Sequence, residues 1–284
     1  MPRTVFVTAA TGTVGRHVVD ELSGADVRVR AGTRDPDRDA AALAAADEVV
    51  DFDFDRPETW GRALDGSPRV FLVRPPGVSV DRLREFVDAL ARTGCPQVAY
   101  LSTLGADRNV LIPHYRIERH LERAAVPETL LRASFFCQNL AEVHGDELRE
   151  RGEIAVPAGD GRTSFVDARD VGAVGARVLA EDGHEYCAYA VTGPEALTYH
   201  EVADVFTEEL GRDVRYVDPS VLSFVRRQRR AGRPLGFALL MVGIYTTARL
   251  GLAARVTDDA ERVLGREPFS MREYVADHRE AFAR

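Results

Sequence analysis

Lysine is absent from this sequence of 284 residues, so all 37 basic residues are arginine. The absence excludes a lysine that cradles nucleotide phosphates, a Schiff base with a carbonyl substrate and a lysine that assists a tyrosine acid. Any catalytic proton donor in this chain must therefore come from another residue type.

Cysteine is scarce as well, with three residues at Cys95, Cys137 and Cys187. Their odd number and their spacing fit neither a disulfide framework nor a metal site, so we expect a reducing, cytoplasmic location. No group of histidine, cysteine, aspartate or glutamate has a convincing metal spacing, and no metal is expected.

Long hydrophobic runs are also missing. The longest, Pro234–Ala248, has about 15 residues, whereas a membrane span needs roughly 20. We interpret it as a buried or lid helix and expect no membrane partner. The first apolar run fits a strand, so no secretory segment is expected. A net charge of −8 argues against a nucleic-acid partner, and the cluster Arg226, Arg227, Arg229, Arg230 and Arg233 is expected to be a solvated helix face.

Apolar strands alternate with amphipathic helical segments through the first two thirds of the chain. The predicted strands are 4–8, 27–31, 48–53, 70–73, 98–102 and 129–132, and residues 80–92 have helical periodicity. This rhythm predicts a Rossmann-like α/β fold, a doubly wound parallel sheet with a smaller, interleaved C-terminal lobe. We expect a nucleotide-binding domain over 1–150, rejoined by 167–193 through a strand at 187–192, and a substrate lobe formed by 151–166 and 194–284.

The most informative segment is residues 7–15, VTAATGTVG, where a β-branched strand runs into glycines that open a helix. Gly12 and Gly15 would let the backbone approach a pyrophosphate, and the helix N-terminus would present N–H groups to it. Ala9 stands where the usual G-x-x-G-x-x-G spacing has its first glycine. Its methyl group is tolerable only at negative φ. An ordinary strand-to-helix turn is the alternative interpretation.

The second predicted strand ends about 20 residues beyond this loop, where a dinucleotide site reads the ribose. An NAD-preferring site would place a carboxylate here, whereas this chain has Gly32 and then Arg34. A guanidinium can hold a 2′-phosphate by two charge-assisted hydrogen bonds. We therefore expect NADP(H) to be preferred over NAD(H), although Asp35 lies next to the arginine and a solvated strand-end arginine is the alternative.

Together these segments resemble the NmrA-like, atypical branch of the short-chain dehydrogenase/reductase superfamily, and most of all its NAD(P)H:quinone oxidoreductase and triphenylmethane reductase members. The likeness covers essentially the whole chain. Its matching pieces are 7–15, FLVRPP at 71–76, YLSTLG at 100–105, HYRIE at 114–118, TLLRASFFCQN at 129–139, VTGP at 191–194, AGRP at 231–234 and VTDD at 256–259.

The resemblance implies a set of cofactor contacts: Thr8, Gly12, Thr13, Val14, Gly15 and Arg34, then Asp53 and Phe54 beside the adenine, and Val73, Arg74 and Pro75 along the nicotinamide. Two departures are Ala9 and Ala133, where the family usually has glycine and proline.

Typical members of the wider superfamily reduce carbonyls with a Tyr-x-x-x-Lys pair followed four residues later by glutamate. Anchoring this pattern on Glu118 puts His114 at the lysine position and Val110 at the tyrosine position. The pair Tyr115 and Arg119 is one residue out of frame, a rotation of about 100° on a helix. The phenolic acid is therefore missing from the pattern.

A site without that acid suits acceptors that delocalise incoming negative charge, because an aryloxide has a conjugate acid with a pKa of about 10 and can wait for a proton from water. His114 is the best helper, unless it is merely packed at a helix start and bonded to backbone. Ser102 and Thr103 would face the nicotinamide, or merely cap their strand. Predicted substrate contacts, with core packing as the alternative, are Phe135, Phe136, Asn139, Phe237, Met241 and Tyr245.

These features favour an NADPH-dependent oxidoreductase that passes hydride directly to a flat conjugated acceptor, such as a quinone or an extended enone. Two alternatives stay open: a non-catalytic dinucleotide redox sensor that reports to a partner protein, and a cyclase or isomerase that uses the same fold without redox chemistry. The expected partner is a small aromatic or quinone-like molecule, and the sequence allows a homodimer.

Overall fold

The structure is a computed structural model that describes residues 3–66 and 68–283. It divides into two compact units, each assembled from three stretches of the chain. The first unit comprises Met1–Ala133, Ala168–Val191 and Asp259–Arg266, and the second comprises Ser134–Asp167, Thr192–Asp258 and Glu267–Arg284.

The first unit is built on a seven-stranded sheet with the strand order β10-β6-β5-β4-β1-β2-β3. Every neighbouring pair of strands is parallel. The strands are β1 (Arg3–Val7), β2 (Val27–Thr33), β3 (Glu48–Asp51), β4 (Arg69–Leu72), β5 (Val98–Thr103), β6 (Glu128–Ala133) and β10 (Cys187–Val191). The predicted Rossmann-like fold and the return of the chain through a strand near residue 187 are thus confirmed.

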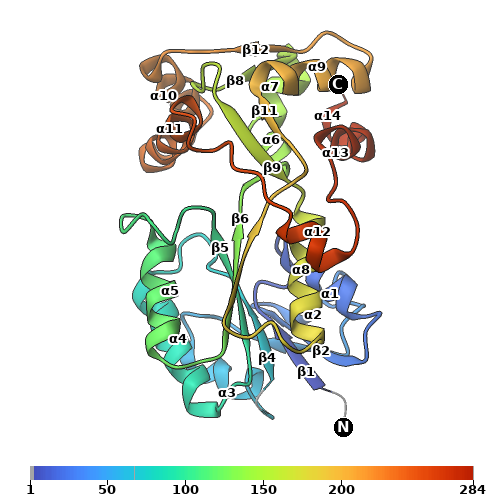
Figure 1. Cartoon of the computed structure of the whole chain (residues 1–284), viewed down its shortest axis with the longest axis vertical. Helices are drawn as coiled ribbons and strands as arrows, with labels where there is room; N and C mark the ends of the chain where they lie inside the picture. The colour runs from blue at the N-terminus through green and yellow to red at the C-terminus, as the bar shows by residue number, and fades with distance from the viewer. Residues whose placement is uncertain (1–2, 67, 284) are drawn as a thin grey trace. The chain divides into compact units, whose positions relative to one another are not determined.

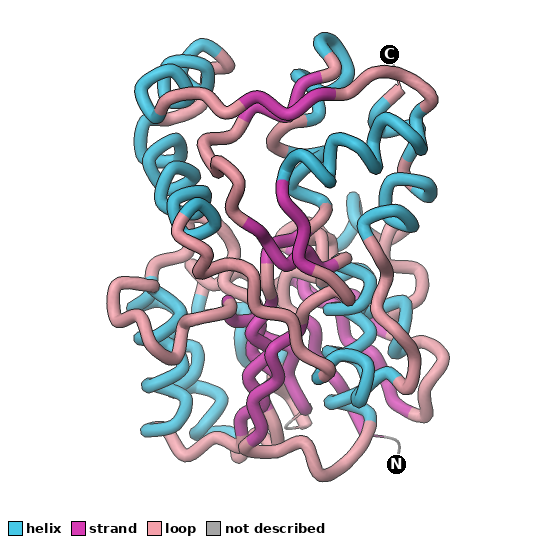
Figure 2. The backbone as a smooth tube through the Cα atoms, turned by 45° about the horizontal axis from the view of Figure 1, so that its top comes forward, coloured by secondary structure: helices cyan, strands magenta, loops and turns pink. Residues whose placement is uncertain are grey.

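Helices cover both faces of this sheet, as a doubly wound fold requires (Figures 1 and 2). Helices α4 (Val80–Thr93) and α5 (Pro113–Arg123) pack together on one face, and α1 (Gly15–Leu22) and α8 (Ala168–Ala180) on the other. Shorter elements complete the unit: α2 (Pro36–Asp39), the 3₁₀ turn η1 (Pro57–Thr59), α3 (Trp60–Ala63) and α12 (Asp259–Leu264). The strand order reverses between β4 and β1, and ligands of such sheets bind at the carboxyl ends of the strands beside that point.

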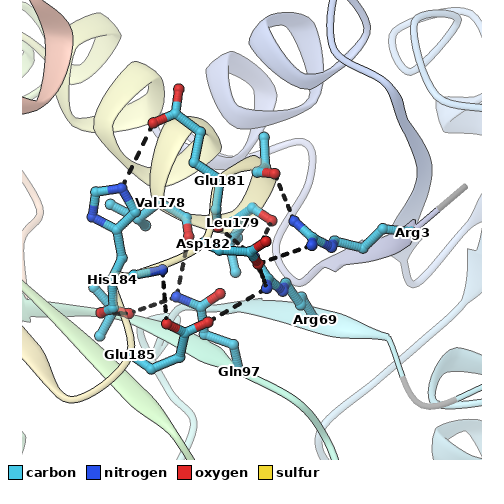
Figure 3. Close-up of polar contacts among 12 residues, drawn as sticks. Arg3, Arg69, Gln97, Val178, Leu179, Glu181, Asp182, His184 and Glu185 are labelled. Atoms are coloured by element: carbon cyan, nitrogen blue, oxygen red, sulfur yellow. Dashed lines mark hydrogen bonds and ion pairs between the residues drawn. The ribbon is translucent and has the colours of Figure 1, made fainter.

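The amino-terminal edge of the sheet is held by the polar network in Figure 3. The last carbonyls of a helix have no partner within it. Arg69 is buried at the start of β4 and donates to the carbonyl oxygens of Leu179 (3.1 Å) and Glu181 (2.5 Å) at the end of α8. Arg3 donates to that of Ala180 (2.6 Å), and both arginines pair with Asp182. This network is structural, because it lies at the opposite strand ends from the expected ligand site.

The second unit contains two small sheets, with strand orders β11-β9-β7 and β12-β8. Its strands are β7 (Phe135–Phe136), β8 (Glu153–Ala155), β9 (Arg162–Val166), β11 (Ala196–Thr198) and β12 (Arg215–Val217). Its helices are α6 (Gln138–Glu142), α7 (Gly145–Arg151), α9 (Tyr199–Leu210), α10 (Val221–Arg230), α11 (Leu235–Arg249), α13 (Met271–Asp277) and α14 (Arg279–Phe282).

The unit boundaries differ from those expected from the sequence. The first falls after Ala133 and not at residue 150, because Cys137, Leu140 and Leu148 pack into the hydrophobic core of the second unit. Residues Asp259–Arg266 belong to the first unit, where the Asp259 carboxylate accepts a hydrogen bond of 2.8 Å from the backbone N–H of Ala190.

Helix α11 corresponds to the apolar run that was expected to be a buried or lid helix. Only one face of it is buried, through Ala238, Met241, Tyr245 and Ala248. Its other face exposes leucines to solvent. In the described part of the chain, no helix combines the length and apolar character that crossing a bilayer would take.

Candidate functional site

Thr8 joins the two strands that flank the reversal in strand order. Its backbone N–H (3.0 Å) and its hydroxyl (2.9 Å) both donate to the carbonyl oxygen of Phe71 at the end of β4. The same hydroxyl accepts a hydrogen bond of 3.0 Å from the backbone N–H of Val73. The loop after β1 and the segment Val73–Pro75 are therefore fixed side by side at the carboxyl edge of the sheet. Thr8 itself is fully buried, so its role in this structure is to position the loop.

The glycines of the loop are required by close backbone packing. A Cβ atom at Gly15 would lie 2.2 Å from the carbonyl oxygen of Ala9, and one at Gly12 would lie 3.1 Å from the same atom. Helix α1 begins at Gly15, and its N-cap residue, Val14, provides no side-chain hydrogen bond to the first turn. The helix thus starts directly against the loop with an N-terminus suited to an anion.

Ala9 adopts a left-handed conformation, with φ of +49°. A methyl group was expected at this position only at negative φ, and this expectation is wrong. The loop therefore keeps the turn that glycine usually makes and carries the strain of an alanine, because Cβ crowds the following carbonyl in this region.

We expect Ala9→Gly to stabilise the protein by about 1 kcal/mol, because glycine adopts this conformation without the Cβ clash. Chemical denaturation with linear extrapolation measures the change. Ala125→Gly is the matched control. Ala125 has φ of +51° and lies in the turn that follows α5, and this turn contains no predicted site residue. The control should give a similar gain in stability. A loss of stability in Ala9→Gly would contradict the assignment of strain to Ala9.

Arg34 is an exposed cation directly after the end of β2. Within residues 3–66 and 68–283 it forms no hydrogen bond or ion pair. Asp35 is the neighbouring carboxylate that could compete with a 2′-phosphate for Arg34. It caps α2 instead, by accepting a hydrogen bond of 3.2 Å from the backbone N–H of Arg38. Asp39 pairs with Arg38 (2.8 Å), and these hydrogen bonds lower the pKa of its carboxyl group. The neighbouring carboxylates thus form their hydrogen bonds with other groups. The charge of Arg34 also contributes to the lowered pKa of Asp39, but without a direct contact, so the guanidinium is left available to an anion.

Two residues near this edge contribute to the hydrophobic core. A Cβ at Gly32 would lie 2.8 Å from the ring of Phe6, so core packing alone requires glycine there. The ring of Phe54 is buried and packs edge-on against Phe52 (4.9 Å between centroids) and Phe86 (5.3 Å). Asp53 stays partly exposed next to it.

A buried polar triad lies where β5 and β6 meet α5. Glu118 is fully buried and accepts hydrogen bonds from the Ser102 hydroxyl (2.5 Å) and from the Arg132 guanidinium (3.1 and 2.7 Å). The hydrogen of the Ser102 hydroxyl is therefore committed to Glu118. Thr103 is partly exposed at the end of β5, and its hydroxyl has no partner in the described part of the chain.

His114 is paired with a tyrosine that the sequence argument missed. Its Nδ1 lies 2.7 Å from the hydroxyl of Tyr100, which is buried on β5. Burial and the charge of Arg74 lower the pKa of His114 to about 4, and burial raises the pKa of Tyr100 well above its ordinary value. Both groups are neutral near pH 7, so His114 is neither an ordinary titrating imidazole nor a histidine bonded to backbone. Tyr100 shares one strand face with Ser102, two residues on, and this period was the signal available in the sequence.

Arg74 follows β4 at the same carboxyl edge. Its Nε atom is buried and lacks a hydrogen-bond partner in residues 3–66 and 68–283. Buried polar groups are nearly always hydrogen-bonded, so an unsatisfied guanidinium nitrogen beside a histidine and a tyrosine indicates a place for a polar ligand.

The predicted substrate residues all lie in the second unit. Met241 and Tyr245 are core residues there, because both are buried and the Tyr245 hydroxyl is hydrogen-bonded to Nε2 of His144 (2.6 Å). Phe135 packs edge-on against Phe165 (5.7 Å between centroids). Phe136, Asn139 and Phe237 are partly exposed, and Phe237 lies under the guanidinium of Arg233.

Comparison with known proteins identifies the family. The model of the NmrA-like family matches residues 1–239. The chain belongs to the NmrA-like family. An NAD(P)H azoreductase from Xenophilus azovorans is 32% identical to this NmrA-like protein over 283 residues, 98% of this chain and 99% of the relative. The family expected from the sequence motifs is confirmed.

Two solved structures are similar to this NmrA-like protein over its whole length. An NADPH-dependent quinone oxidoreductase from Escherichia coli, complexed with NADPH, has a TM-score of 0.87 and 25% identity, covering 96% of this chain and 99% of that one. The triphenylmethane reductase of a Citrobacter species, complexed with NADP(H), has a TM-score of 0.85 and 24% identity, covering 97% and 99%. The second likeness supports the fold alone.

Proposed function

We propose that this protein transfers a hydride from NADPH directly to a flat conjugated acceptor, such as a quinone or an extended enone, without a tyrosine–lysine acid pair. It is an NAD(P)H-dependent oxidoreductase, as its full-length relatives are. The finer proposal is carried by one observation: a neutral phenol on β5 is hydrogen-bonded to a neutral imidazole in the first turn of α5, in a chain without lysine.

The residues of the first unit fit NADP(H) by their own geometry. The uncapped start of α1 at Gly15 would receive the pyrophosphate, and the unpaired Arg34 guanidinium would hold the 2′-phosphate. Val73 and Arg74, fixed beside Thr8, would border the nicotinamide. When bound, NADPH supplies the hydride.

The proposed role of Tyr100 and His114 is to hold the acceptor oxygen by a hydrogen bond, while water supplies the proton. In the proposed tautomer the Tyr100 phenol donates to Nδ1 of His114, so the other ring nitrogen, Nε2, carries a proton that it can offer to an acceptor oxygen. Hydride addition to a quinone leaves an aryloxide, whose conjugate acid has a pKa of about 10. A hydrogen bond from the neutral imidazole stabilises this anion until water protonates it. The alkoxide from a simple ketone needs a stronger donor at once.

The proposed function is tested by mixing the protein with NADPH and a panel of quinones, enones and simple ketones, and by following the absorbance of the nicotinamide. Oxidation of NADPH with the conjugated acceptors but not with the ketones supports the proposal. Tight NADPH binding without oxidation by any acceptor would favour a redox sensor instead. Product formation without NADPH consumption would favour a cyclase or isomerase.

The imidazole pKa of about 4 predicts a specific pH dependence. Since His114 stays neutral until the pH falls toward that value, kcat with a quinone should show no inflection near pH 6.5, where an ordinary histidine titrates. Tyr100→Phe removes the phenol that fixes the tautomer and should lower kcat about tenfold, with the KM for NADPH unchanged. Tyr115→Phe, on α5 beside His114, is the control. An inflection near 6.5 in the wild-type profile would contradict the assigned role.

Replacing Arg34, the exposed cation after β2, should change the preference for NADPH over NADH. We expect Arg34→Gln to weaken NADPH binding about thirtyfold and to leave NADH binding unchanged, because only NADPH carries the 2′-phosphate. Isothermal titration with both dinucleotides measures this. Arg28→Gln removes the same charge from the other end of β2 and is the control. An equal loss for both cofactors would show that Arg34 does not read the 2′-phosphate.

A further inference from the structure

Charge is distributed very unevenly along the second unit. Residues 221–256, which contain α10 and α11, include seven arginines and no aspartate or glutamate, in a chain whose net charge is −8. These arginines are Arg226, Arg227, Arg229, Arg230, Arg233, Arg249 and Arg255. Such a basic block within an acidic protein requires an explanation, because uncompensated like charges repel one another.

Carboxylates from elsewhere in the unit neutralise only two of the seven. Arg227 pairs with Glu147 and Glu153 at 3.0 Å each, and Arg249 pairs with Asp218 at 2.6 Å. The other five have no carboxylate partner among the described residues. Of these, Arg226, Arg229 and Arg230 lie on the exposed side of α10, opposite the buried Phe224 and Gln228.

The same two helices expose aliphatic side chains. Leu222 on α10 is 67% exposed, and Leu239 and Leu240 on α11 are 53% and 60% exposed. Val221, Leu235, Leu250 and Leu252 are also exposed. Helix α11 is thus apolar on its solvent side as well as on its buried side, a pattern normal for a helix covered all round. Figure 1 shows α10 and α11 side by side, and they pack against each other.

We propose that these exposed leucines and unpaired arginines, the α10–α11 surface, dock the protein on a bilayer that contains anionic phospholipids. Lipid phosphates would pair with the arginines, and the leucines would enter the region between headgroups and acyl chains. The helices would lie on the bilayer, since α11 has 15 residues and a span needs roughly 20. This inference is independent of the proposed reaction and departs from the expectation of no membrane partner.

Two other occupants fit this surface less well. A nucleic acid would pair with the arginines but would leave the exposed leucines in water. A protein interface typically centres on aromatic side chains and is depleted of charge at its core, whereas the exposed apolar residues of α10 and α11 are aliphatic and three unpaired arginines lie on α10. By helical spacing Leu222 shares one face of α10 with Arg226 and Arg229. This is the pattern of an interfacial helix, because arginine stems pack along apolar surface while their charged ends stay in water.

Sedimentation with vesicles tests the proposal on the full-length protein. We expect the protein to bind vesicles of phosphatidylcholine mixed with phosphatidylglycerol, not to bind vesicles of phosphatidylcholine alone, and to be released by salt. No binding to the mixed vesicles, or equal binding to both kinds, would overturn the proposal. So would tighter binding to a short DNA duplex than to the mixed vesicles.

Variants separate the charged and apolar contributions. The triple variant R226Q/R229Q/R230Q should weaken the partition onto mixed vesicles about a hundredfold, and L239Q/L240Q should weaken it at least about tenfold. The control R92Q/R123Q/R151Q removes three exposed arginines from helices of both units and should change the partition less than about threefold.

Thermal melting verifies that each variant is folded. A control that loses as much binding as the α10 variant would overturn the proposal. A dimer dispersed by L239Q/L240Q, with no vesicle binding, would do so too.

Discussion

Gly15→Ala is expected to abolish dinucleotide binding, with a loss of at least a hundredfold in affinity for NADPH. The added Cβ would lie 2.2 Å from the carbonyl oxygen of Ala9, a backbone atom that no side-chain rotation can move away. The loop and the start of α1 must therefore separate, and the N-terminus that would receive the pyrophosphate is displaced. We also expect a loss of stability of about 3 kcal/mol from this overpacking.

The same substitution at Gly61 is the matched control for Gly15→Ala. Gly61 lies in α3, where an added Cβ would meet no atom within 4 Å. Gly61→Ala should therefore be neutral or stabilising by up to about 1 kcal/mol, and should bind NADPH like the wild type. Calorimetric titration and chemical denaturation measure both quantities. Retention of NADPH affinity in Gly15→Ala would remove the loop from the cofactor site.

Glu118→Gln is expected to destabilise the protein by about 3 kcal/mol. It removes the negative charge from a fully buried carboxylate that pairs with Arg132, and it leaves that guanidinium, only 17% exposed, without a counter-ion. Glu122→Gln, on the same helix, changes a 35%-exposed pair with Arg119 and should cost no more than about 0.5 kcal/mol. Urea denaturation with a common slope m compares the two.

The double variant E118L/R132M separates the stability of this triad from its role in the site. Replacing both charges by apolar groups of similar volume should recover most of the stability lost in Glu118→Gln. If a stable double variant turns over a quinone more slowly than the wild type, the Glu118–Arg132 pair positions the strand ends for the reaction. A double variant less stable than Glu118→Gln would contradict the assignment of the cost to an unpaired Arg132.

The sheet could be predicted from the sequence because its strands are short, β-branched and buried on both faces, and because each is followed by a helical period. The loop after β1 could be predicted from the spacing of Gly12 and Gly15. Both glycines are required because the backbone of Ala9, only a few residues away, leaves no room for a Cβ atom. Arg34 was likewise proposed from its distance along the chain from the glycines. In each case the cause is local in sequence.

The features that could not be predicted depend on contacts distant in sequence. From the sequence, Phe54 is only a neighbour of Asp53 at the end of a strand. Its burial depends on Phe86 from α4, which packs against it. Tyr100 and His114 are 14 residues apart, and only the packing of α5 on β5 brings their polar atoms together. Ala9 is a different case: its positive φ is imposed by the contact of the loop with Gly12 and α1, and residue preference alone argues against it.

The five crossings of the chain between its two units, after Ala133, Asp167, Val191, Asp258 and Arg266, constrain how such a protein can evolve. Neither unit is a contiguous gene segment, so recombination at one breakpoint cannot exchange a whole second unit for that of a relative. A fragment ending at Ala133 would lose α8 and the edge strand β10 along with the second unit. Changes to the second unit in this architecture must therefore arise chiefly by point substitution and loop insertion, because no single exchanged segment contains that unit alone.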